Sequence, residues 1–215
     1  MSLDVGFLAA LGRERLVAII RGTDPQASIR AARTLFEAGI RFVEVSLVMP
    51  DALRVIAEVA ASAPEGAVIG AGTVLTRADV RAAAAAGARF LVTPAVTESV
   101  AEAAAHGIPV LAGAFTPTEV VAALELGATA VKLFPAAVGG PGYLRALRGP
   151  LPGVAFVPVG GIDAALAAAY FAAGALAVGV GSPLVGDAAD GGDLVALTAR
   201  AAAFRAVSTR TSAPR

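Results

Sequence analysis

The segment that decides the fold is residues 90–135, which read FLVTPAVTESVAEAAAHGIPVLAGAFTPTEVVAALELGATAVKLFP. Short apolar runs at 90–94, 110–115 and 130–135 alternate with Ala- and Glu-rich stretches at 97–106 and 117–126. Short apolar runs bounded by turn residues are typical of buried strands, whereas the longer stretches are typical of helices. The segment therefore predicts strand, helix, strand, helix, strand, which is the repeating unit of a parallel sheet.

The same alternation continues through the rest of the chain. Strands are expected at 17–21, 42–47, 68–73, 90–94, 110–115, 130–135, 155–160 and 177–182. Helices are expected at 25–38, 50–63, 76–86, 97–106, 117–126, 143–148, 163–173 and 193–206. Five of these helices run into a glycine that can form a left-handed C-cap, namely Gly39, Gly87, Gly107, Gly127 and Gly174.

Eight consecutive βα units with no shift in composition favour an α/β protein with a single (β/α)8 TIM barrel, expected over residues 16–207. A short N-terminal helix at 1–15 would precede the barrel, and a disordered tail at 208–215 would follow it. The alternative is an open, doubly wound sheet, because simple βα patterns look alike in the two folds.

Composition excludes several kinds of function. Hydrophobic residues make up 57% of the chain and charged residues 16%, which suits strands buried on both faces or an oligomer. The formal net charge is zero and the basic residues are scattered, so neither nucleic acid nor a membrane is an expected partner. No apolar run is long enough to span a bilayer and no signal-peptide pattern opens the chain, so a cytoplasmic protein is expected.

The nucleophile and metal-ligand inventory is unusually restricted. Cys is absent and His106 is the only histidine, which excludes thiolate chemistry and a His-rich metal site. We therefore expect no metal and no separate cofactor. Of the 17 basic residues, 16 are Arg and one is Lys132. The chain uses Arg wherever charge alone suffices, so Lys132 marks a position that needs a nucleophilic amine.

Catalytic residues of a barrel lie at the carboxyl ends of its strands. Lys132 and Glu44 each lie inside an apolar predicted strand, where an unpaired charge is costly to bury. One interpretation is a structural ion pair between them. The other is catalytic: a neutral Lys132 amine attacks a ketone, and Glu44 transfers protons. The resulting iminium would accept electrons as a carbon–carbon bond breaks to give an enamine.

Glycines and polar side chains at other strand ends suggest how a substrate is held. Backbone N–H groups at 160–163 and 179–183, after the last two strands, match the usual phosphate cradle of such barrels, although tight turns also explain glycine. Arg21 could hold a carboxylate or pair with an acid, and Thr73 could bind a carboxylate or cap a helix. His106, at a helix end, is assigned no role.

Seven short motifs occur along the chain in the same order as in a known enzyme family. They are Glu-Val-Ser-Leu at 44–47, Gly-Ala-Gly-Thr-Val-Leu at 70–75, Val-Thr-Pro at 92–94, Phe-Thr-Pro-Thr-Glu at 115–119, Lys-Leu-Phe-Pro-Ala at 132–136, Val-Gly-Gly-Ile at 159–162 and Gly-Val-Gly-Ser at 179–182. Together they resemble the 2-keto-3-deoxy-6-phosphogluconate (KDPG) and 4-hydroxy-2-oxoglutarate (KHG) aldolase family over residues 17–184.

The resemblance implies a metal-free class I aldolase, usually a homotrimer, that cleaves KDPG to pyruvate and glyceraldehyde 3-phosphate. Its partners would be a small keto acid and a phosphorylated aldehyde. By similarity Lys132 forms the Schiff base and Glu44 is the general acid and base. Thr73 binds the pyruvate carboxylate, and Pro94 and Phe134 line the pyruvate pocket. The phosphate cradle is expected to consist of Gly160, Gly161, Gly181 and Ser182.

One departure from the family pattern concerns the carboxylate site. Many members carry an Arg four residues after the catalytic Glu, where this chain has Val48. Arg21 is the candidate replacement. Pro50 and the stretch at 140–147 also resemble the 2-keto-3-deoxy-6-phosphogalactonate branch. That substrate, unphosphorylated 4-hydroxy-2-oxoglutarate, and an inactive barrel used as a binding module are the alternatives.

Overall fold

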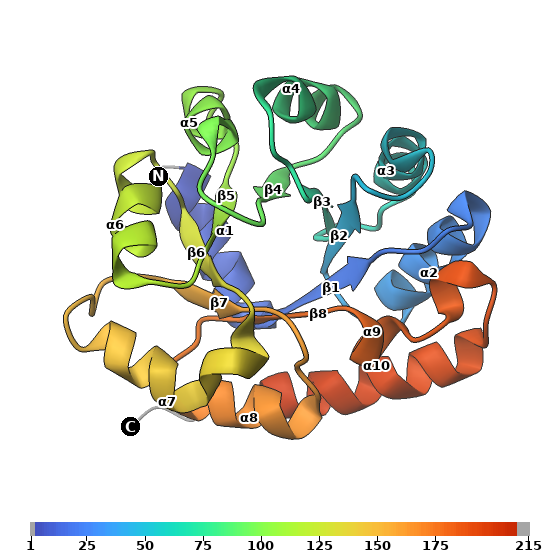
Figure 1. The fold of residues 1–215 in the computed structure, drawn as a ribbon. Coiled ribbons are helices and arrows are strands. Elements are labelled where there is room, and N and C mark those ends of the chain that lie inside the picture. Colours follow the sequence, from blue (N-terminus) through green and yellow to red (C-terminus); the bar gives the residue numbers. More distant parts are fainter. Residues whose placement is uncertain (1–2, 210–215) are drawn as a thin grey trace.

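Eight parallel strands form the centre of the computed structural model, which describes residues 3–209 (Figure 1). Their bounds are β1 (Leu16–Ile20), β2 (Phe42–Ser46), β3 (Val68–Gly72), β4 (Phe90–Val92), β5 (Val110–Ala114), β6 (Ala130–Leu133), β7 (Phe156–Pro158) and β8 (Val178–Val180). The strand order is β7-β6-β5-β4-β3-β2-β1-β8. All eight predicted strands are present, and the (β/α)8 barrel prediction is confirmed.

Helices surround the sheet on its outer side, except α1, which lies at one end of the barrel (Figure 1). They are α1 (Leu3–Glu14), α2 (Pro25–Glu37), α3 (Ala52–Ala61), α4 (Arg77–Ala85), α5 (Glu98–Ala105), α6 (Pro117–Glu125), α7 (Ala136–Arg148), α8 (Ala164–Ala172), α9 (Ser182–Val185), the 3-10 turn η1 (Ala188–Asp190) and α10 (Leu194–Thr209). The five predicted C-cap glycines all have positive φ, between 64° and 102°. In residues 3–209, no helix combines the length and apolarity that a membrane span requires.

The barrel closes between β7 and β8. Val159 and Gly179 form an isolated parallel β-bridge at the ends of these strands, and the N–H of Leu176, just before β8, donates to the Phe156 carbonyl of β7. A Cβ on Gly179 would lie 2.7 Å from Cγ2 of Val159, so only glycine permits this approach. The loops after these two strands therefore start from neighbouring points.

Aromatic side chains fill the amino-terminal end of the barrel. Phe42 and Phe90 open β2 and β4, and Phe7 of α1 packs against both, with ring centroids 5.6 Å and 5.7 Å away. Phe42 and Phe90 are fully buried or nearly so. Helix α1 thus covers this end of the barrel, and the opposite end stays available for chemistry.

Four of the boundaries that differ from the sequence predictions have a clear physical reason. Predicted strands extend too far at Thr73 and Gly160, because both have positive φ, which ends a strand. The helix predicted at 143–148 begins at Ala136, and Gly140 interrupts it with φ 66° and ψ 176°. The tail predicted at 208–215 is wrong at its start, because the hydroxyl of the buried Ser208 donates to the Phe204 carbonyl within α10. The rest of that tail, 210–215, lies outside the described residues.

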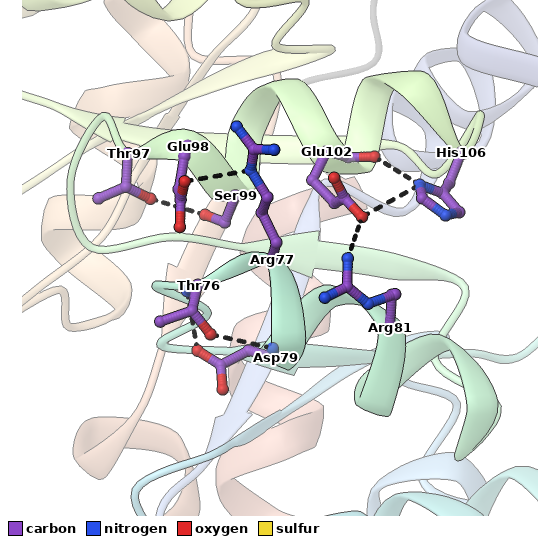
Figure 2. Close-up of polar contacts among 9 residues, drawn as sticks. All are labelled: Thr76, Arg77, Asp79, Arg81, Thr97, Glu98, Ser99, Glu102 and His106. Atoms are coloured by element: carbon purple, nitrogen blue, oxygen red, sulfur yellow. Dashed lines mark hydrogen bonds and ion pairs between the residues drawn. The ribbon is translucent and has the colours of Figure 1, made fainter.

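Ion pairs join α4 to α5 on the outside of the barrel (Figure 2). Arg77 Nε lies 3.1 Å from Glu98 Oε2, and Arg81 Nη1 lies 2.7 Å from Glu102 Oε1. His106 Nδ1 lies 2.8 Å from the carbonyl oxygen of Glu102, at the end of α5. His106 therefore lies on this outer surface and not at a strand end, in agreement with the sequence, which assigns it no catalytic role.

Removing one of these ion pairs is expected to have little effect. Arg81→Ala should lower the free energy of unfolding by less than about 1 kcal/mol, because the Arg81 side chain is 58% exposed and solvent screens its charge. Urea unfolding of the variant measures this change, and Arg77→Ala is the matched control on the same helix. If Arg81→Ala lost more than about 3 kcal/mol in free energy of unfolding, the pair would stabilise the packing of α4 on α5 far more strongly than surface ion pairs usually do.

Candidate active site

A cavity of about 460 Å³ opens at the carboxyl ends of the strands. It is lined by all ten site residues predicted from the sequence: Arg21, Glu44, Thr73, Pro94, Lys132, Phe134, Gly160, Gly161, Gly181 and Ser182. These residues come from loops and strands that span residues 21 to 182, so only the closed barrel brings them together. Ile19, Ser46, Val159 and Pro183 complete the lining and were not predicted.

Two buried ionisable groups share this cavity. Glu44 on β2 is 3% exposed, and Lys132 on β6 is 7% exposed. Within residues 3–209, neither side chain has a hydrogen bond or an ion pair, so the structural ion pair considered from the sequence is not formed. Nζ of Lys132 lies 5.0 Å from the centroid of the Phe134 ring. An amine and a carboxyl that make no hydrogen bond or ion pair in a cavity are available to a ligand.

Burial raises the pKa of the Glu44 carboxyl above its ordinary value, and the positive charges of Lys132 and Arg21 oppose this rise. Desolvation is the largest contribution, because the charged carboxylate loses its hydration inside the barrel. The carboxyl therefore holds its proton to higher pH than a free Glu does. A group with a raised pKa can donate a proton near neutral pH and accept it back.

This shift predicts a pH-dependent stability difference. Between the ordinary and the raised pKa, the unfolded chain releases the Glu44 proton and the folded protein keeps it. The free energy of unfolding therefore falls as pH rises through this window. Glu44→Gln lacks the titration, so its stability relative to the wild type should increase with pH there. Urea unfolding of both proteins across a pH series measures this, and a difference independent of pH would contradict it.

Glycine on β3 makes room for the Glu44 carboxyl. Gly72 pairs with Ser46 in the β2–β3 ladder, so it lies beside the Glu44 side chain. A Cβ on Gly72 would overlap Oε1, Cδ and Cγ of Glu44, far inside van der Waals contact. In the sequence, Gly70 and Gly72 are part of the family motif at 70–75, and nothing there indicates that Gly72 faces a catalytic candidate.

Thr73 holds an uncommon backbone conformation directly after β3. Its φ is 59°, in the left-handed region that β-branched residues rarely occupy. Its Oγ1 lies 2.9 Å from Oγ of Ser46. The cap of α4 is Thr76, whose side chain accepts from the Asp79 N–H. The alternative interpretation of Thr73 as a helix cap is therefore wrong, and its hydroxyl lies at the cavity instead.

The Pro94 turn is fixed by a buried hydroxyl. Thr93 is fully buried, and its Oγ1 donates to the Ala95 carbonyl at 2.6 Å and accepts from the Gly113 N–H at 3.1 Å. A Cβ on Gly113 would overlap the Pro94 backbone. The loop after β4 is thus bound to β5, and Pro94 forms a rigid part of the cavity wall.

Backbone amides gather where β7 and β8 end. Gly160 and Gly161 have φ of 106° and 69° and follow the bridge residue Val159 directly. Gly181 and Ser182 lie at the start of α9, across the closing bridge. Successive backbone N–H groups in a turn of this kind can form a concave nest that suits an anion. The structure therefore brings the four predicted cradle residues to one wall of the cavity.

Arg21 is exposed at the mouth of the cavity, directly after β1. Thr23, two residues later, donates from its N–H and its hydroxyl to the Asp190 carboxylate, which anchors this loop to η1. Val48 is 63% exposed and does not line the cavity. In the part of the chain that the structure describes, no group of three or more His, Cys, Asp or Glu could hold a metal ion.

Comparison with known proteins agrees with this geometry. Residues 8–199 match the family model for KDPG and KHG aldolase. The chain is 40% identical over 181 residues to a probable 2-dehydro-3-deoxy-6-phosphogalactonate aldolase of Rhizobium meliloti (strain 1021), covering 83% of this chain and 85% of that protein. It is 38% identical over 168 residues to the 2-dehydro-3-deoxy-phosphogluconate aldolase of Treponema pallidum (strain Nichols), covering 76% and 78%.

A solved structure described as native KDPGal superposes with a TM-score of 0.85 at 34% identity, covering 91% of this chain and 95% of that one. The family match spans most of the barrel and every residue of the cavity lining. The family predicted from the seven motifs is therefore confirmed. The chain belongs to the KDPG and KHG aldolase family and is a carbon–carbon lyase.

Proposed function

We propose that this enzyme cleaves a 2-keto-3-deoxy-6-phospho sugar acid to pyruvate and glyceraldehyde 3-phosphate through a Schiff base on Lys132. One observation carries the proposal: the only lysine of the chain is buried in the strand-end cavity that Glu44 also lines, and within residues 3–209 it makes no hydrogen bond or ion pair. The amine of a lysine is the group that forms a Schiff base with a ketone.

The reaction follows from these two groups. The Lys132 nitrogen attacks the C2 ketone to give a carbinolamine, and loss of water gives an iminium. Removal of the C4 hydroxyl proton breaks the C3–C4 bond, the aldehyde leaves, and the electron pair forms an enamine. Protonation at C3 and addition of water release pyruvate and restore the amine. Glu44, whose pKa burial raises, supplies and accepts these protons. The iminium formed on the protein amine is the electron sink, so these steps need no metal and no cofactor.

Substrate recognition is assigned to two groups of cavity residues. Thr73 and Arg21 would bind the carboxylate, and Pro94 and Phe134 would line the pyruvate pocket. Gly160, Gly161, Gly181 and Ser182 would bind the phosphate through backbone N–H groups and the serine hydroxyl. A cavity of about 460 Å³ is large enough for a six-carbon phosphorylated acid.

The configuration of the sugar acid has two candidates. KDPG is the substrate expected from the motifs, and the Treponema pallidum relative is named for it. The galactonate epimer is favoured by the Rhizobium meliloti relative at 40% identity and by Pro50 and the stretch at 140–147, which resemble the galactonate branch. Of the two, we propose the galactonate epimer as the better substrate.

Measuring kcat/KM on three substrates tests this assignment. We expect the 6-phosphogalactonate acid to exceed KDPG, and both to exceed unphosphorylated 4-hydroxy-2-oxoglutarate by at least about 100-fold, because only the phosphate contacts the cradle. Gly161→Ala, which would add a Cβ at φ 69°, should lower the first two values and not the third. Equal values for phosphorylated and unphosphorylated substrates would contradict the phosphate assignment.

We also propose a homotrimer. Val48, Leu53 and Leu75 are 63%, 41% and 43% exposed near the loops that follow β2 and β3, so an apolar surface is available for association. Light scattering after gel filtration should give three times the chain mass of 21.1 kDa. A monomeric mass across the concentration range would contradict it.

A further inference from the structure

Ser46 is the cavity residue whose role neither the motifs nor the comparisons address. It lies two positions after Glu44 on β2, so its side chain points to the same face of the strand. It is 2% exposed and lines the cavity. Among residues 3–209, the hydroxyl of Thr73 is its one side-chain hydrogen-bond partner, at 2.9 Å between oxygens. The Ser46 hydroxyl is therefore placed to orient the Thr73 hydroxyl through this hydrogen bond.

Thr73 needs such a partner because its own geometry is strained. With φ at 59°, the Thr73 side chain points in a different direction from that of a residue with extended backbone. Residues strained in this way are often found at functional sites. The backbone aims the side chain at the cavity, but it leaves the hydroxyl proton free to rotate. Ser46 is the neighbouring group that restricts that rotation.

The direction of this hydrogen bond decides what Thr73 offers a ligand. If Thr73 donates to Ser46, only lone pairs of Thr73 face the cavity, and these repel a carboxylate. If Ser46 donates to Thr73, the Thr73 proton is free to donate to a carboxylate, and a polarised hydroxyl is a better donor. An anionic ligand therefore selects the second arrangement.

We propose that Ser46 is a positioning residue that donates to Thr73 and so turns the Thr73 hydroxyl into a carboxylate donor. The inference rests on the proposed function, in which Thr73 binds the carboxylate of the keto acid. It also suits a chain with Val48, since that side chain is 63% exposed, lies outside the cavity lining and supplies no charge to the carboxylate.

Borohydride trapping of pyruvate, read as the pyruvate concentration for half-maximal modification of Lys132, measures carboxylate binding directly. Ser46→Ala should raise this concentration and the KM for the sugar acid by about tenfold, with kcat within about twofold, because the lost hydrogen bond acts on binding. Ser46→Thr keeps a hydroxyl and should stay within about twofold of the wild type. A KM that Ser46→Ala leaves unchanged would overturn the proposal.

A double-mutant cycle separates positioning from direct contact. Thr73→Val removes the Thr73 hydroxyl and keeps the branched shape at φ 59°. If Ser46 acts through Thr73, Ser46→Ala should add nothing to the KM of Thr73→Val. If the two substitutions raise KM by factors that multiply, Ser46 binds substrate itself. If Ser46→Ala lowers both kcat and Tm, its role is structural. Either result overturns the proposal.

Failure of this inference is distinguishable from failure of the proposed function. The wild-type protein must first form the pyruvate adduct on Lys132. Absence of that adduct overturns the proposed function together with this inference. An adduct that forms in the wild type, and forms at the same pyruvate concentration in Ser46→Ala, overturns the role of Ser46 alone.

Discussion

Lys132→Arg is expected to reduce kcat for carbon–carbon cleavage by roughly 10⁴-fold or more, because it removes the nucleophile. Arginine keeps the positive charge but its guanidinium stays protonated and cannot form a Schiff base. Lys132 is 7% exposed on β6, so no other amine of a chain with one lysine can replace it. Steady-state cleavage assays, with pyruvate release as the readout, measure the loss.

A second variant at position 132 distinguishes loss of the nucleophile from loss of the fold. Lys132→Met is close in length and apolar, which suits a position surrounded by β5 and β7. Both variants should keep the wild-type circular dichroism spectrum and unfold cooperatively. If a folded variant of either kind retained cleavage within about tenfold of the wild type, the covalent mechanism would be wrong.

Gly72→Ala is expected to lower kcat by about 10²- to 10³-fold although it changes no titratable group. The added Cβ would overlap the Glu44 carboxyl, so the carboxyl must leave the position from which it serves Lys132. Forcing a methyl group into this packed site should also lower the free energy of unfolding by about 1–3 kcal/mol. The assay is kcat for cleavage, with urea unfolding of the same preparation.

Gly153→Ala is the matched control, because a Cβ at Gly153 has no neighbour within 4 Å and the residue has no positive φ. It should keep wild-type kcat. In a Glu44→Gln background, Gly72→Ala should lower kcat only a little further, since the group it displaces is already inactive. Full additivity of the two substitutions would show that Gly72 acts on some other part of the site.

Much of the fold and of the site could be predicted because it depends on patterns within short stretches of the sequence. The alternation of apolar runs with Ala-rich stretches placed every strand, and the glycines after helices marked turns that do adopt positive φ. The barrel rule, that strand carboxyl ends carry the chemistry, then selected Lys132, Glu44 and the glycines of the cradle. All ten predicted positions line one cavity, while their individual roles stay predictions.

The remainder depends on contacts between strands, which a single sequence does not show. Gly72 matters because the β2–β3 register places it beside Glu44, and Ser46 matters because the same register places it beside Thr73. The start of α7 was also missed. Gly140 and the following proline resemble a loop, but the Ala136 N–H donates to the Val159 carbonyl and holds the first turn against the end of β7.

The central claim, that Lys132 forms a Schiff base with a keto acid, is tested most directly by mass spectrometry after treatment with pyruvate and sodium borohydride. We predict a single adduct of reduced pyruvate, confined on peptide mapping to the peptide that contains Lys132, and dependent on both reagents. A folded, wild-type protein that gains no mass, or gains it on another peptide, would contradict the claim.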